Sequence, residues 1–551
     1  MGPNTQIYLL HSTSEAFQNH FDKLCGDYTW TATMASNEKH DLVQVGIANE
    51  TSTSAISPDI QQDQSLLEKQ TRTLRLFSKS QLFAFSLVYL GTGYYVAGNM
   101  YFALANGGPA AWVFSYLVVA AGVLCQVAAF SEMASIQPIA GAQYYWTWHF
   151  APQSLKRFLT WMQGWSTWAG YIALLASCLN GNTVILEGLI QLAHPEYKTG
   201  GWHTALIMIA TVAFCAVINM YAFWLVPWFE LLTGFLNVCM VTTLFIVLWA
   251  MAPRNSADIF MQTNVSSGWG NYFVSANLGA LSNIYLFISF ESVVHMGEET
   301  QNAKSAVPFA LFWSTVTNAL MGLVMIITFA MGMPSLNTLL NSASPIVTTL
   351  LYATASTKAT IAIISGLVVL GISGTMGVVS SVSRLTWAWA RDGGLPQYFG
   401  HVDAVQRVPL RAVVLATIIA SLLSLLNIGS STYIAFSAII SLSSLAVYLS
   451  YAIVLACLLY ARLNGGFKPG PWNLGRAGSM VNMLGLVYTV YIMVWLPFPN
   501  YLPVTAANMN YCGPVFGLII IGVVSLWFIR GREHWKGPNR AVVEIVLGEE
   551  D

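Results

Sequence analysis

Long uncharged stretches constrain the fold of this chain more than any other feature of its sequence. No Asp, Glu, Lys or Arg occurs between Lys79 and Glu132, and similar stretches recur up to Arg530. Charged side chains are costly in hydrocarbon and a membrane helix needs about 20 apolar residues, so each stretch predicts one or two transmembrane helices. Only 9% of the 551 residues are charged, which excludes a soluble enzyme and a nucleic-acid-binding protein. We predict an all-α polytopic membrane protein embedded in a lipid bilayer.

The uncharged stretches together predict about twelve transmembrane helices, and the basic residues predict their orientation. With the N-terminus inside, the outer loops would contain only three of the 23 Lys and Arg residues, namely Lys198, Arg254 and Lys358. Positively charged residues favour the cytoplasmic side, and an even number of spans places both termini on one side. We therefore expect both termini to be cytoplasmic.

Three parts follow from this reading. Residues 1–75 are polar and predicted to be a disordered cytosolic tail, residues 76–531 form the twelve-span domain, and residues 532–551 form a second cytosolic tail. A glycosylation sequon begins at Asn264, in the predicted outer loop between spans five and six.

Two of the predicted spans contain residues that interrupt a helix. Span one carries Gly91, Thr92 and Gly93 near its centre, where glycine costs about 1 kcal/mol of helix stability. Span six carries Glu291, preceded by Ser289 and Phe290 as the expected break. Transporters often bind their solute where two helices unwind at equivalent positions of inverted repeats. The offset of five spans fits inverted repeats of five helices each, at about residues 80–250 and 276–461, followed by two extra C-terminal helices.

Each interruption has a functional and a structural interpretation. The free amides at Gly91–Gly93 would form an anion site, but glycines also permit close packing of membrane helices. Glu291 would be a functional carboxylate inside the membrane, or alternatively a structural hydrogen-bonding residue or a residue at the membrane surface.

Several sequence strings carry a family resemblance, from about Leu82 to Pro538. They are ALANGGPAAW (Ala103 to Trp112), SEMASIQPIAGAQYYW (Ser131 to Trp146), HMGEETQNAKSAVP (His295 to Pro308), ARDGGLP (Ala390 to Pro396), LPVTAANMNY (Leu502 to Tyr511) and FIRGREHWKGP (Phe528 to Pro538). The chain resembles the amino acid–polyamine–organocation transporter superfamily, and in particular its fungal branch of choline, GABA and amino-acid permeases. Where relatives often have a small residue followed by Asp in span six, this chain has Phe290 and Glu291.

The resemblance implies a secondary active transporter that imports a small amine-bearing solute by alternating access, with a proton as the coupling ion and without cofactor or metal. Glu291 would bind the amine, the span-one amides a carboxylate, and aromatic rings a quaternary ammonium by cation–π attraction. The expected substrate-binding residues are Gly91, Thr92, Gly93, Tyr94, Ser289, Phe290 and Glu291. The candidates for proton coupling or gating are Glu230, Glu291, His295, Glu298 and Arg384, although a surface charge cluster would also explain some of them.

A nutrient sensor and a membrane enzyme are the alternatives to a transporter. A nutrient sensor with a transporter fold stays open, as does a carrier of polyamines or other organocations. An enzyme is not expected, because the sequence has no zinc-ligand spacing, G-x-S-x-G motif, P-loop or paired-histidine helix motif. The resemblance favours the plasma membrane, and the sequence leaves a vacuolar membrane and the oligomeric state open.

Overall fold

The structure is a computed structural model that describes residues 73–342, 344–428, 432–505, 508–539 and 542. Within these residues the regular secondary structure is helical, and extended pairing is limited to the isolated bridges Phe77–Thr300 and Asn106–Val265. The predicted all-α class is therefore confirmed. Most of the predicted tail 1–75 and the end of the predicted tail 532–551 lie outside the described residues.

In the part of the chain that the structure describes, eleven helical segments are long and apolar enough to cross a membrane. The main helices of these segments are α5 (Gly108–Ile136), α7 (Lys156–Ala193), α8 (Gly201–Tyr221), α9 (Val226–Met251), α10 (Tyr272–Tyr285) with the 3-10 helix η3 (Phe290–Glu299), α11 (Ala303–Gly332), α14 (Thr357–Arg391), α15 (Leu410–Ser424), α16 (Thr432–Leu463), α17 (Gly478–Trp495) and α18 (Cys512–Leu526), some of them extended by adjoining short helices. Two shorter helices, α3 (Lys79–Leu90) and α4 (Thr92–Ala105), follow one another across Gly91 and form the remaining crossing. Together these segments account for the twelve predicted spans.

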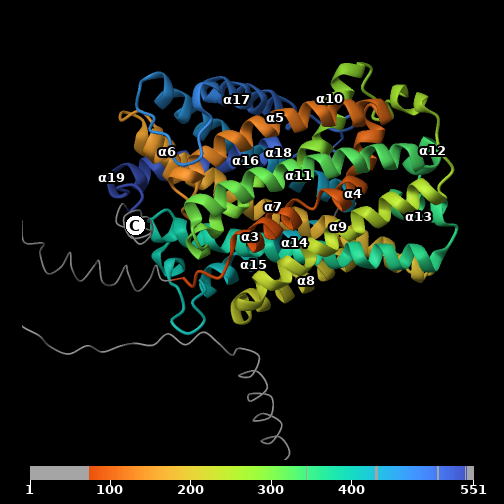
Figure 1. The fold of residues 1–551 in the computed structure, drawn as a ribbon, viewed down its shortest axis with the longest axis horizontal. Helices are drawn as coiled ribbons and strands as arrows, with labels where there is room; N and C mark the ends of the chain where they lie inside the picture. Colours follow the sequence, from red (N-terminus) through yellow and green to blue (C-terminus); the bar gives the residue numbers. More distant parts are fainter. Residues whose placement is uncertain (1–72, 343, 429–431, 506–507, 540–541, 543–551) are drawn as a thin grey trace, which may run out of the picture. The chain divides into compact units, whose positions relative to one another are not determined.

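Short elements lie at the two ends of the bundle. Figure 1 shows α6 (Gln143–Phe150) and α19 (Arg532–His534) at one end, which we call the α6 end, and α12 (Leu336–Leu340) and α13 (Pro345–Thr354) at the opposite α13 end. The remaining short helices are η1 (Phe223–Leu225), η2 (Ala257–Met261), η4 (Gln397–Gly400), η5 (Leu425–Asn427), η6 (Gly475–Ala477) and η7 (Trp527–Gly531).

The packing of the helices divides most of the bundle into two groups. In the first group α3, α4, α5, α10, η3 and α11 pack mainly on one another, and in the second group α7, α8, α14 and α15 do so. Helix α9 packs against both groups, whereas α16 packs mainly on α7 and α17. Each group combines spans from the first half of the chain with spans five places later, as the predicted repeats would require. The inverted relation between the repeats stays a prediction.

The first span is interrupted at Gly91, whose backbone is left-handed with φ 50° and ψ 34°. Glycine adopts this conformation without a steric penalty and commonly ends a helix there. One side chain of α11 satisfies both sides of the break. The Asn318 Oδ1 atom accepts hydrogen bonds from the Thr92 amide at 3.3 Å and the Thr92 hydroxyl at 2.5 Å, and its Nδ2 donates to the Leu87 carbonyl at 3.3 Å.

The sixth span is interrupted between Tyr285, where α10 ends, and Phe290, where η3 begins. Ser289 is left-handed with φ 57°, a conformation that is uncommon for a residue other than glycine. Its amide donates to the Tyr451 hydroxyl of α16 at 3.1 Å, which provides one tertiary contact that holds the strained position. The predicted interruptions of spans one and six are thus both present.

The Asn318 contact predicts a specific loss of stability. Replacing Asn318 with Leu keeps the volume but leaves the buried Thr92 amide and hydroxyl without their acceptor, which costs about 1–3 kcal/mol for each unsatisfied group. We expect the apparent Tm of the detergent-solubilised protein, followed by size-exclusion chromatography after heating, to fall by several degrees. Thr317→Val is the matched control, because Thr317 is only partly buried and its hydroxyl bonds to its own helix at the Trp313 carbonyl. Equal Tm values for the two variants would contradict the role assigned to Asn318.

Candidate functional site

The carboxylate of Glu291 lies at the break of the sixth span and is completely buried. Its Oε1 atom accepts hydrogen bonds from Gln143 Nε2 at 2.7 Å and from the Tyr171 hydroxyl at 3.0 Å. Its Oε2 atom accepts from the Tyr451 hydroxyl, the same oxygen that accepts from the Ser289 amide. The three donors come from α6, α7 and α16, so elements far apart in the sequence converge on one side chain.

The donors around Glu291 are all neutral. The buried ion pairs found among the described residues involve other carboxylates. Hydrogen bonds reduce the cost of burying an anion but supply no counter-charge. This arrangement is therefore chemically suited to receive a cation.

Aromatic rings surround the same carboxylate. The rings of Phe290, Phe130 and Tyr451 are mutually packed, with centroid separations of 5.2, 5.0 and 5.1 Å. Tyr171 packs edge-on against His295 with centroids 4.8 Å apart. Such faces can stabilise a bound cation by about 0.5–2 kcal/mol each. The side chain of Tyr94, which the sequence also predicted here, lies outside the described part of the structure.

The span-one residues are engaged within the protein in this conformation. The Thr92 amide is already bonded to Asn318, so a carboxylate at this amide would have to replace that side chain. Gly93 faces α9, where a β carbon would lie 2.4 Å from Val241 Cγ2. Gly93 therefore permits close packing of α4 on α9, which is the structural interpretation that the sequence left open.

Glu230 is a second buried carboxylate, located where α9 meets α14. Its Oε2 atom accepts from the Ser373 hydroxyl at 3.1 Å. Its Oε1 atom has no hydrogen-bond partner among the described residues. Glu230 is thus much less compensated than Glu291 and shares no donor with it.

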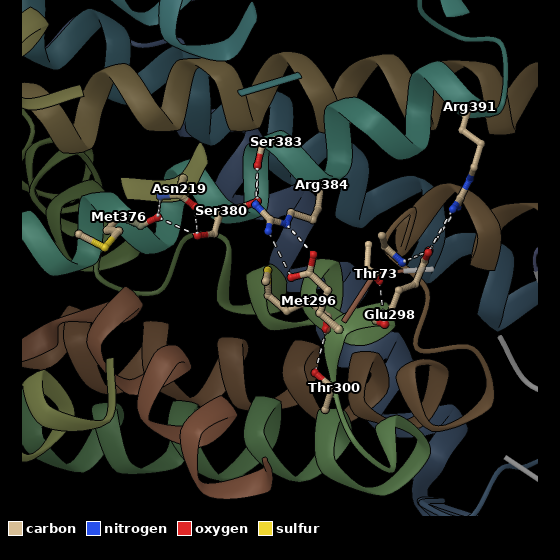
Figure 2. Close-up of polar contacts among 12 residues, drawn as sticks. Thr73, Asn219, Met296, Glu298, Thr300, Met376, Ser380, Ser383, Arg384 and Arg391 are labelled. Carbon is tan, nitrogen blue, oxygen red and sulfur yellow. Dashed lines mark hydrogen bonds and ion pairs between the residues drawn. The ribbon is translucent and has the colours of Figure 1, made fainter. Parts of the chain in front are cut away.

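Two buried ion pairs connect η3 of the first group with α14 of the second group, and Figure 2 shows both arginines pointing toward η3. Arg384 Nε lies 3.1 Å from Glu299 Oε1, and Arg391 Nη1 lies 3.1 Å from Glu298 Oε2. The predicted gating residues Glu298 and Arg384 are therefore neighbours, but each pairs with a different partner. Removing one partner of such a buried pair strongly destabilises a protein, because the other charge is left buried without compensation.

A third buried pair joins Glu132 of α5 with Arg462 of α16. The other Glu132 oxygen accepts from the Leu474 amide at 3.1 Å. In all three pairs the acid belongs to the first group and the arginine lies outside that group. The contacts therefore join the first group to the rest of the bundle.

His295 attaches η3 to the segment that precedes α6. Its Nδ1 lies 2.7 Å from the Ala140 carbonyl, which can only accept, so Nδ1 carries the proton. The Ala140 amide in turn donates to Glu298 Oε1 at 3.1 Å. His295 therefore has a structural contact at this end of the bundle.

Asn264 lies in the segment between η2 and α10, which joins the fifth and sixth predicted spans. Its Nδ2 atom, to which a glycan would be attached, donates to the Leu104 carbonyl at 3.1 Å and to the Ser266 hydroxyl at 2.7 Å. Glycosylation would require these bonds to open. Across the described residues, no group of three or more His, Cys, Asp or Glu side chains is placed to hold a metal ion.

Some site residues were not singled out from the sequence. Gln143 appeared only inside a family string, and Tyr451 is one of 24 tyrosines with no local signal that distinguishes it. A tyrosine within an apolar span is usually a packing or interface residue. The partner of Glu291 on α16 could be found only from the three-dimensional arrangement.

Comparison with known proteins identifies the family to which the chain belongs. The sequence pattern of the family described as "Amino acid permease" matches residues 77–524. The chain is 26% identical to an uncharacterized amino-acid permease of Schizosaccharomyces pombe over 505 residues, covering 89% of this chain and 91% of the relative. It is 27% identical to the choline transporter of Saccharomyces cerevisiae over 450 residues, covering 80% of this chain and 78% of the relative. It is 26% identical to amino-acid permease 2 of Neurospora crassa over 478 residues, covering 84% of this chain and 86% of the relative.

The chain is a multi-pass membrane protein of the transporter class and belongs to the amino acid permease family. The resemblance to fungal choline and amino-acid permeases is thereby confirmed.

The ion pairs predict a strong, rescuable effect on stability. Glu299→Ala leaves Arg384 buried and unpaired, which is expected to destabilise the protein by about 3–5 kcal/mol. Adding Arg384→Met removes the unpaired charge, so the double variant should recover part of the lost Tm in detergent. The exposed Glu196→Ala serves as a control without effect. A double variant less stable than Glu299→Ala alone would contradict direct pairing.

Proposed function

We propose that this protein is a secondary active transporter that imports a small amine-bearing solute of the amino acid, GABA or choline class together with a proton. The observation that carries the proposal is the buried Glu291 carboxylate, which has hydrogen-bond donors but no counter-charge at the break of the sixth span. Membership of the amino acid permease family supports transport, and the names of the choline transporter and amino-acid permease relatives support this range of solutes.

The two ends of the solute are recognised to different extents. Glu291 and its aromatic neighbours supply a site for the amine. The Thr92 amide, the candidate for a solute carboxylate, is bonded to Asn318. This difference favours the cationic end of the solute as the main determinant of its recognition. Competition between choline and GABA for uptake tests it, because only GABA carries a carboxylate.

Alternating access would take place by movement of the first group relative to the second group. The α6 end is closed by the three buried ion pairs. Asn99 of α4 lines two cavities, one of which also borders Ser344 and Pro345 at the start of α13 and the other Tyr285 and Asn500. The opposite state would open the α6 end by separating the three ion pairs.

With the predicted orientation, the α6 end is cytoplasmic. The membrane proposed for the protein is the plasma membrane.

Glu230 is the group proposed to carry the coupling proton. It is buried with a single hydroxyl donor, and its second oxygen has no hydrogen-bond partner within the described residues. A carboxylate so weakly compensated is costly to keep charged, whereas a carboxylic acid is not. Glu291, with three donors, is better suited to remain an anion that binds an amine.

Replacing Glu291 tests the amine site. Glu291→Gln removes the anion but keeps the size, so we expect the kcat/KM of radiolabelled solute uptake to fall by about 10- to 100-fold, as for loss of a hydrogen bond to a charged group. The assay uses choline, GABA and a panel of amino acids in a permease-deficient fungal strain. Glu187→Gln is the matched control, a buried glutamate of α7 bonded to Thr204 away from the site. Wild-type uptake by Glu291→Gln would remove Glu291 from the site.

A nutrient sensor with the same fold would bind solute without moving it. Absence of uptake of every solute by the wild-type protein, with surface expression confirmed, would therefore favour a sensor. Uptake of spermidine in preference to the other solutes would instead indicate a polyamine carrier.

Replacing Glu230 separates coupling from binding. Glu230→Gln cannot exchange a proton, so uptake should lose its stimulation by an acidic exterior, while exchange of labelled for unlabelled solute at equal pH should continue. Vesicles with an imposed pH gradient provide the measurement, and Glu187→Gln again serves as control. Retained acid stimulation in Glu230→Gln would place the coupling proton elsewhere.

A further inference from the structure

Three consecutive residues of the short helix α6 contact two separate parts of the protein. Gln143 donates to the Glu291 carboxylate at the central break. The next two residues contact Asp392, which directly follows α14. The Tyr144 hydroxyl donates to Asp392 Oδ2 at 2.6 Å, and the Tyr145 hydroxyl donates to Asp392 Oδ1 at 3.3 Å. One rigid turn therefore links the central carboxylate with Asp392.

Asp392 also receives the C-terminal part of the chain. Its Oδ1 atom accepts from the Asn539 amide at 3.1 Å, and its carbonyl accepts from Trp535 Nε1 at 2.8 Å. We call residues 531–539 the C-terminal strap. The same carboxylate thus holds α6 on one side and the strap on the other.

The strap is docked by more than these two bonds. The Trp535 side chain is buried and its ring packs on three tryptophans, with centroids 5.5 Å from Trp161, 5.8 Å from Trp389 and 6.3 Å from Trp148. The Arg157 guanidinium donates to the carbonyls of Gly531, Arg532 and Trp535. These contacts place the strap on α6, α7 and α14 at once.

The protonation states around Asp392 suit this arrangement. Burial raises the pKa of the Tyr144 and Tyr145 hydroxyls, so both stay protonated and able to donate at neutral pH. Burial also raises the pKa of Asp392, an effect that the neighbouring Arg391 and these hydrogen bonds oppose.

The segment before α6 is fixed to the first group, whereas Asp392 belongs to the end of the second group. Ala140 bonds to His295 and Glu298 of η3, and Gly297 of η3 packs against Pro138, where a β carbon would lie 2.1 Å from the carbonyl oxygen. Any separation of η3 from α14 must therefore strain or break the contacts of α6 on one of its two sides.

We propose that α6 couples the Gln143–Glu291 hydrogen bond to docking of the C-terminal strap on Asp392, so that each contact stabilises the other. Gln143, Tyr144 and Tyr145 act as positioning residues in this device. Because coupling between two sites is reciprocal, loosening Glu291 loosens the strap, and release of the strap alters the affinity of the central site. The last statement rests on the proposed transport function, whereas the coupling itself does not.

Limited proteolysis of the purified full-length protein measures strap docking without any solute. The side chains of Arg530, Arg532 and Lys536 are exposed and offer trypsin sites in or beside the strap, and cleavage removes an epitope tag placed after residue 551. Cleavage of a packed segment requires local opening, so its rate reports the open population. Asp392→Ala removes the docking carboxylate, so trypsin should cleave this variant at least about tenfold faster than the wild type.

The decisive variants lie at the other side of α6 and do not touch the strap. Gln143→Leu and Glu291→Gln should each speed cleavage by about fivefold or more, the lower range of typical coupling between sites. Gln126→Leu, a buried glutamine of α5 that bonds to Thr489 of α17, is the matched control and should cleave at the wild-type rate. Only material that elutes as a monodisperse peak is compared, and Gln143→Met, which also lacks the donor, replaces Gln143→Leu if the latter does not fold.

Fast cleavage of Asp392→Ala together with wild-type rates for Gln143→Leu and Glu291→Gln would overturn the proposal, because the strap would then dock independently of the central carboxylate. The result does not depend on whether the protein transports any solute tested. A protein with coupled cleavage but no uptake would retain this inference and lose the proposed function.

Discussion

The free-energy cost of placing a charge in a membrane determines which helices of this structure must pack together. A chain with only 9% charged residues nevertheless buries Glu291 and Glu230 inside its bundle and pairs Glu132, Glu298 and Glu299 with arginines. Each of these acids must be compensated by a donor or a cation from another helix. The compensating partners come from elements far apart in sequence, so the positions of a few carboxylates determine which helices must meet.

The same constraint explains how the helix breaks are tolerated. An interrupted helix leaves amides and carbonyls that the membrane cannot satisfy. Asn318 satisfies the break at Gly91, and the Tyr451 hydroxyl accepts from the amide of Ser289. Tyr451 also donates to Glu291. A single hydroxyl therefore stabilises both the irregular backbone and the carboxylate that the irregular backbone presents.

The sequence predicted the features that depend on composition along the chain, and failed for those that depend on register between helices. Gaps between charges predicted the twelve spans, and Glu291 stood out because a charge interrupted an apolar stretch. By contrast, Gly93 could equally serve packing or binding, and only the position of Val241 shows that it permits packing here. Likewise Glu298 and Arg384 were both singled out, but their separate partners depend on a one-residue difference along η3 that no local pattern encodes.

The segregation of charge between the two sides of the buried ion pairs has a consequence for the proposed movement. All three acids of the buried pairs lie on the first group, and all three arginines lie outside it. In the proposed alternating-access movement these surfaces would separate and form an anionic and a cationic wall facing one another across water. Opposite charges attract appreciably over a Debye length, about 8–10 Å at physiological salt. In that movement the two walls would pull the α6 end toward closure before any of the pairs is in contact.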